Sequence, residues 1–196
     1  MFDIVTEPSS PQPQIEPLSR TQILAAMGIT ALILLVVARL WLAFDTVEMV
    51  PFALTLPALL VGAGLGVGIS AASAVAYQLW GAYRTSANLY LNLVLSSLTL
   101  PDLIWLGLLP GMSEELLFRG VMLPAIGLNV WGVAISSLCF GVLHFSGIQH
   151  WSYIVWATVI GAILGASALT TGNLLVPIVA HIVTNLISGY VWKLNP

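Results

Sequence analysis

Charged residues are scarce in this sequence. Five Lys and Arg and eight Asp and Glu occur among 196 residues, a charged fraction of 7%, whereas soluble domains have about 25%. The few basic residues form no patch, which excludes nucleic-acid binding. Hydrophobic residues make up 59% of the chain and the mean hydropathy is +1.00. The composition therefore excludes a water-soluble globule and predicts an integral, multi-pass membrane protein whose first partner is the lipid bilayer.

Cysteine is also scarce, and the first twenty residues have none of the features expected of a secretory leader. The lone Cys139 excludes an intramolecular disulfide and a thiolate metal cluster, and its apolar neighbours predict a small buried residue. Residues 1–20 carry four prolines but neither a basic stretch nor an apolar run, so they do not resemble a signal peptide. We expect a disordered tail over 1–20.

Long apolar runs are abundant. A membrane crossing needs roughly 20 apolar residues, and long, non-alternating runs favour helices over a barrel. The sequence predicts an all-α, polytopic membrane bundle of about six to seven transmembrane helices, with N-terminal helices over 21–97 and a second region over 98–192. The expected spans are 23–44, 51–84, 89–109, 130–144, 153–169 and 174–192.

Local signals refine this outline. Small residues in 62–68 and 161–165 are spaced four apart, which predicts close helix packing. Pro110 and Gly111 indicate a break, after which Ser113 is a candidate N-cap for a new helix. The region 89–126 fits either two full spans or one long, broken span.

Six strongly polar residues stand inside otherwise apolar segments. An ionisable group at bilayer depth costs at least about 2.5–3.5 kcal/mol, so each is a candidate functional residue. They are Glu114, Glu115, Arg119, His144, His181 and Asn185.

Helical spacing suggests how these residues are used. Glu115 and Arg119 are four apart and can pair on one face, which leaves Glu114, about 100° around the helix, for another role. A carboxylate in an apolar pocket suits a general base. His144 and His181, on two further helices, can supply a base, oxyanion donors or metal ligands. The alternative is that these groups form interhelical hydrogen bonds only.

Three short motifs carry a family resemblance. They are "EELLFR" at 114–119, "FGVLH" at 140–144 and "HIVTN" at 181–185. In this order they resemble EExxxR, FxxxH and HxxxN of the CPBP family of intramembrane proteases, which includes the CAAX prenyl proteases and Abi-type proteins. The resemblance covers about 98–192 and identifies this region as a CAAX protease-like catalytic core.

The resemblance implies hydrolysis of a peptide bond in a membrane-associated protein or peptide. It implies that Glu114 and His144 activate water, that His181 and Asn185 stabilise the oxyanion, and that Glu115 and Arg119 orient the site. The family has been described both as zinc-dependent, which here would use Glu114, His144 and His181 as ligands, and as metal-free. We favour the metal-free reading.

Two other functions remain as alternatives. The same fold can serve as a non-proteolytic membrane scaffold or assembly chaperone with a membrane-protein complex as its partner. A small proton-relaying transporter is the third hypothesis, although the paired broken helices of transporters are absent from the sequence. Bacterial plasma membrane, thylakoid and organelle membranes impose the same hydropathy and are not distinguished.

Overall fold

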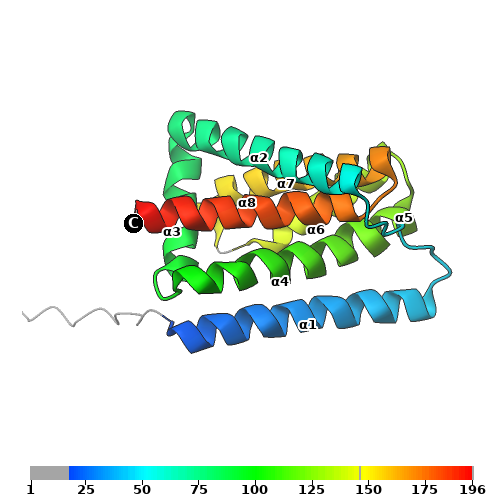
Figure 1. The fold of residues 1–196 in the computed structure, drawn as a ribbon, viewed down its shortest axis with the longest axis horizontal. Coiled ribbons are helices and arrows are strands. Elements are labelled where there is room, and N and C mark those ends of the chain that lie inside the picture. Colours follow the sequence, from blue (N-terminus) through cyan, green and yellow to red (C-terminus); the bar gives the residue numbers. More distant parts are fainter. Residues whose placement is uncertain (1–17, 146, 196) are drawn as a thin grey trace, which may run out of the picture.

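The computed structural model describes residues 18–145 and 147–195, and all regular secondary structure in these residues is helical (Figure 1). This confirms the all-α fold class. The predicted tail falls largely on 1–17, outside the described residues. The helices are α1 (Arg20–Phe44), α2 (Leu56–Leu79), α3 (Gly81–Leu95), η1 (Leu100–Asp102), α4 (Leu103–Glu115), the π-helix η2 (Leu116–Met122), α5 (Leu123–Ile126), α6 (Val130–Leu143), η3 (Ile148–His150), α7 (Trp151–Thr171) and α8 (Leu175–Leu194).

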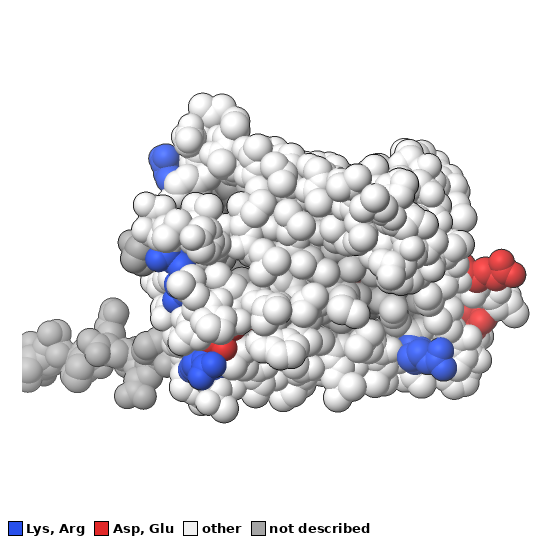
Figure 2. All heavy atoms as spheres, viewed as in Figure 1, with Lys and Arg blue, Asp and Glu red and all other residues white. Residues whose placement is uncertain are grey.

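The helices have the lengths and surfaces of a multi-pass membrane protein. Among the described residues, α1, α2, η3 with α7, and α8 are each long and apolar enough to cross a membrane. The helices over Gly81–Leu95 and Leu100–Ile126 are apolar enough only as a pair, which is bent by 106° at its break, so it counts as a fifth span if the pair is taken as one. The 14-residue α6 is shorter, so fewer helices than the six to seven expected qualify by length alone. Charged side chains gather at the two ends of the face in Figure 2 and leave an uncharged band between them.

Local capping determines where several helices begin and end. The Ser19 hydroxyl and the Gln22 side chain form a capping box at the start of α1. Thr55 accepts the N–H of Ala58 at the start of α2, and Asn129 accepts two N–H groups at the start of α6. Helix α7 ends at Gly172, whose φ of 59° is easily adopted by glycine.

Helix α8 lies in the centre of the bundle, packed most extensively against α2 and α4 (Figure 1). Close approach depends on glycine: a Cβ at Gly62 or Gly66 of α2 would lie within 2.8 Å of α8 atoms. The predicted packing role of 62–68 thus matches the observed contact between α2 and α8. Because α8 carries two of the predicted site residues, this packing helps to position the site.

The predicted helix start at Ser113 is wrong. Helix α4 continues through Pro110, and Ser113 lies one turn before its transition to η2. The proline removes one helical hydrogen bond, but the carbonyl it leaves free, that of Leu106, accepts Nδ2 of Asn185 at 3.3 Å. Because the Leu106 carbonyl has a hydrogen-bond partner on α8, α4 can continue at Pro110 and Gly111, where the local sequence alone predicts a break.

The expectation that Cys139 is buried is also wrong, because its side chain is exposed on α6. The buried face of this helix carries Ser136, Ser137 and Phe140, whereas Leu138 and Cys139 face outward. In a membrane protein the lipid-facing surface is as apolar as the interior. An apolar sequence context therefore does not distinguish the two faces.

Candidate functional site

A cavity of about 360 Å³ lies among the helices and brings together residues from all three motifs. Its lining includes four predicted site residues, Glu114, His144, His181 and Asn185. The first comes from the end of α4, the second from the end of α6 and the last two from successive turns of α8. Residues more than 60 positions apart thus share one enclosed space.

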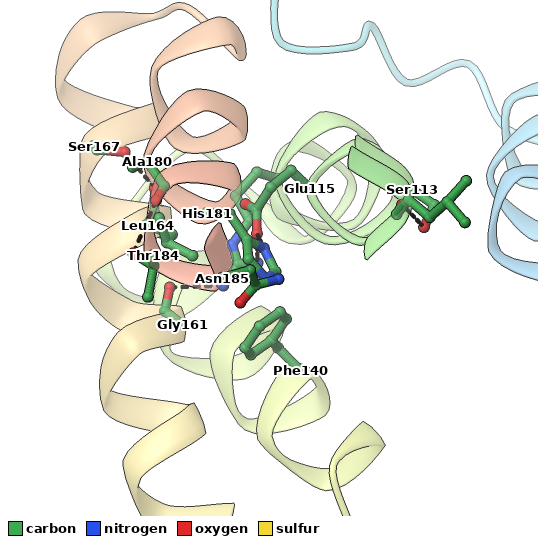
Figure 3. A network of polar contacts seen from close by, with 12 residues as sticks. Ser113, Glu115, Phe140, Gly161, Leu164, Ser167, Ala180, His181, Thr184 and Asn185 are labelled. Atoms are coloured by element: carbon green, nitrogen blue, oxygen red, sulfur yellow. Dashed lines mark hydrogen bonds and ion pairs between the residues drawn. The ribbon is translucent and has the colours of Figure 1, made fainter. Parts of the chain in front are cut away.

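Glu115 is the centre of a buried polar network (Figure 3). Its Oε1 accepts a hydrogen bond from Arg119 Nη1 at 2.8 Å and another from His181 Nδ1 at 2.8 Å. Glu115 and Arg119 are fully buried and His181 is nearly so. The predicted i, i+4 pair is therefore present, and it extends to a histidine on α8.

The guanidinium of Arg119 is held from three directions. Besides Glu115, its Nη2 donates to the carbonyl of Gly161 on α7 at 2.8 Å, and its Cζ lies 4.4 Å from the ring centroid of Phe140 on α6. A Cβ at Gly161 would lie 3.0 Å from Arg119 Nη2. The glycine therefore provides both the acceptor and the space, and Arg119 connects three helices.

Glu114 differs from its neighbour in having no ion-pair partner. Its side chain is buried, and no described group donates to its Oε2. Glu115 forms the ion pair with Arg119, while Glu114 lines the cavity. The π-helix that begins at Leu116, two residues after Glu114, is a feature often found at functional sites. A buried carboxylate with an unused acceptor can receive a proton from a molecule in the cavity.

The hydrogen bonds of the two histidines indicate which ring nitrogen carries a proton and which is left for other contacts. His144 Nδ1 lies 2.9 Å from the carbonyl oxygen of Phe140; because a carbonyl only accepts, Nδ1 carries the proton and Nε2 of the neutral ring is an acceptor. His181 Nδ1 faces Glu115 in the same way, which leaves its Nε2 for other contacts. No described hydrogen bond joins Glu114 to either imidazole, although the three side chains line the same cavity.

Two aromatic residues of the site were missed by sequence reasoning. Tyr90 on α3 and Tyr153 on α7 stack with ring centroids 4.6 Å apart, and both line the cavity. Their centroids lie 6.3 and 6.1 Å from that of His144. No local motif marks them, because their proximity to His144 arises only when α3 and α7 pack together.

The candidate zinc ligands are not grouped around one point in the described residues. Within residues 18–145 and 147–195, no three His, Cys, Asp or Glu side chains are placed to hold one ion. Glu114, His144 and His181 line the cavity, and the hydrogen bonds of the two histidines at Nδ1 leave their Nε2 atoms open to other partners. Because no such group of three is found in the described residues, we derive no step through a metal.

The fold and the site define the class: a multi-pass α-helical membrane protein with a mainly apolar cavity that contains a few polar side chains. Residues 95–187 match the family model described as type II CAAX prenyl endopeptidase Rce1-like, a match that includes all six predicted site residues. This match confirms the predicted resemblance of the region to the CAAX protease family.

The chain is also similar to a curated protein. Over 94 residues the chain is 38% identical to "Uncharacterized protein YpbD" of Bacillus subtilis (strain 168). The alignment covers 48% of this chain and 47% of that protein, so the chain spans about half the length of the curated relative it matches. No solved structure matches the chain.

Proposed function

We propose that the protein is an intramembrane endopeptidase of the CAAX protease type that hydrolyses a peptide bond in a membrane-associated protein or peptide. The observation that carries this proposal is the buried Oε2 of Glu114, which has no described donor and belongs to a side chain that lines the same cavity as His144. No described hydrogen bond uses the Glu114 side chain, whereas Oε1 of Glu115 accepts from Arg119. Oε2 of Glu115 and Nε of Arg119 also have no described partner, but only Glu114 of these three residues lines the cavity.

In the proposed reaction, Glu114 takes a proton from a water molecule in the cavity, and Nε2 of His144 accepts the water's second hydrogen and orients it. The oxygen forms a bond to the scissile carbonyl carbon as the C=O π electrons move to oxygen. The C–N bond then breaks, and the proton on Glu114 passes to the leaving nitrogen. The resulting carboxylic acid loses its proton to the surroundings. General-base assistance of this kind contributes about 10²–10⁴ in rate.

The network around Glu115 suits stabilisation of the oxyanion. With Nδ1 donating to Glu115, Nε2 of His181 is left to face the cavity, and in the protonated ring this nitrogen donates a hydrogen bond to the developing oxyanion. Arg119 fixes the carboxylate and is itself fixed by the Gly161 carbonyl. Glu115 and Arg119 are therefore proposed as orienting residues, and His181 as the oxyanion donor.

The proposal is tested by Glu114→Gln, which keeps the shape of the side chain and removes its basicity. Membrane proteomes of cells carrying the wild type, Glu114→Gln or the exposed control Glu48→Gln are compared for an uncleaved protein. We expect a substrate to accumulate only with Glu114→Gln, and its cleavage by purified variant to fall at least about 100-fold. Full complementation of a deletion strain by Glu114→Gln would contradict hydrolysis and favour the scaffold alternative.

A further inference from the structure

Asn185 makes a contact with α4 that its motif does not explain. Its Nδ2 donates to the carbonyl of Leu106 at 3.3 Å. In an unbroken α-helix this carbonyl would accept the N–H of the residue four positions later, but that residue is Pro110, which has none. Asn185 therefore occupies an acceptor that the proline has made available.

The backbones of α4 and α8 approach closely beside this contact. A Cβ at Gly107 would lie 3.0 Å from Leu186 Cγ, and one at Gly111 would lie 2.6 Å from Ile182 Cγ1. Larger residues at these two glycines would push the helices apart. A side chain as short as asparagine can reach the opposite backbone because both positions lack side chains.

The polar contacts lie on either side of this glycine contact. Leu106 with Asn185 lies toward one end and Glu115 with His181 toward the other, so the two helices run antiparallel between them. Apolar packing alone permits helices to slide, whereas two directional contacts fix the position of one helix along the other. A shift of one turn, about 5.4 Å, would separate Glu115 from His181.

We infer that Pro110 and Asn185 form a tie that sets the register of α4 against α8 and thereby holds Glu115 against His181. Asn185 is then a positioning residue, with one Nδ2 hydrogen committed to Leu106. Because Glu115 and His181 are residues of the proposed catalytic site, this inference rests on the proposed function.

The first test measures unfolding of the full chain in detergent micelles. Asn185→Leu leaves the Leu106 carbonyl without a donor, and we expect the Tm to fall by about 2–10 °C. In a Pro110→Ala background the backbone N–H at position 110 satisfies that carbonyl, so Asn185→Leu should lower the Tm by less than half as much. Pro57→Ala is the control, because Pro57 lies in the first turn of α2 and frees no carbonyl in its helix.

The second test observes the His181 side chain directly. The chain has three histidines, so ¹⁵N-histidine labelling and single His→Gln variants assign each ring. We expect Asn185→Leu to shift the His181 Nδ1–H resonance. Pro110→Ala should not restore it, because the restored backbone bond lies within α4 and no longer connects α4 to α8. A role confined to stability would leave this resonance unchanged.

Either of two results overturns the inference. One is that the Tm losses of Asn185→Leu in the wild-type and Pro110→Ala backgrounds are equal, which means that Leu106 is not the relevant partner. The other is an unchanged His181 resonance in Asn185→Leu. That result is expected if Asn185 acts only by contacting the substrate. Neither measurement requires proteolysis, so a failure here is distinguishable from a failure of the proposed hydrolysis.

Discussion

Replacing Arg119 by Met tests whether the buried network holds the bundle together. The fully buried guanidinium donates to Glu115 and to the Gly161 carbonyl and lies over the ring of Phe140. A hydrogen bond to a charged group contributes about 1.5–3 kcal/mol and a neutral one about 0.5–1.5. The substitution also leaves the Glu115 carboxylate buried without its cation. Breaking a buried pair in this way costs about 3–5 kcal/mol, which is the loss that we expect.

Equilibrium unfolding in mixed detergent micelles, followed by the fluorescence of the seven tryptophans, measures this loss. Arg84→Met is the matched control, because Arg84 is exposed and makes only a 3.5 Å contact with the carbonyl of Gln78; it should change stability by no more than about 0.5 kcal/mol.

A double-mutant cycle combines Arg119→Met with a second substitution, Glu115→Gln. In the Arg119→Met background it removes the uncompensated charge, so the double variant should be more stable than Arg119→Met alone. An Arg119→Met variant within about 1 kcal/mol of the wild type, or a double variant less stable than Arg119→Met, would refute the ion pair as a stabilising contact.

Three further outcomes are expected. Gly161→Ala places a Cβ 3.0 Å from Arg119 Nη2 and should lower stability by about 1–3 kcal/mol. A Cβ at Gly64 has nothing within 4 Å, so Gly64→Ala should raise stability by about 0.5–1 kcal/mol. Equilibrium unfolding in mixed micelles measures both variants. Asp102→Asn removes the charge that pairs with Arg20 at 2.7 Å, and its lowering of the Tm should shrink in 1 M salt, where the Debye length is about 3 Å. Exhaustive chelation should leave cleavage of an identified substrate unchanged, and metal-dependent recovery of lost activity would contradict metal-free hydrolysis.

Contacts within one helix were the most predictable part of the site. The spacing of Glu115 and Arg119 alone predicts their pair, and the pair is present at 2.8 Å. The same reasoning separated Glu114 from that pair, because adjacent residues point in different directions around a helix. Such relations depend only on helical geometry, which the sequence determines over short distances.

Contacts between helices were not predictable in this way. His181 donates to Glu115 across 66 positions of sequence, and nothing in "HIVTN" indicates which glutamate it faces. The continuation of α4 through Pro110 depends on a donor supplied by Asn185 of another helix. The orientation of Cys139 depends on which face of α6 meets its neighbours. Each outcome requires the relative rotation of two packed helices, which the local pattern of apolar residues leaves open.

The π-helix Leu116–Met122 also affects how this region of the gene can change in length. An α-helix closes its turns with bonds between residues four apart, whereas a π-helix joins residues five apart and so holds one more residue in the turn. Deleting one residue here can therefore return the turn to α-helical bonding, with Glu114 and the segments beyond Met122 kept close to their present orientation. Deleting one residue within α8 would instead rotate the parts on either side by about 100° relative to one another. We therefore expect single-residue deletions to be tolerated better within Leu116–Met122 than within α8.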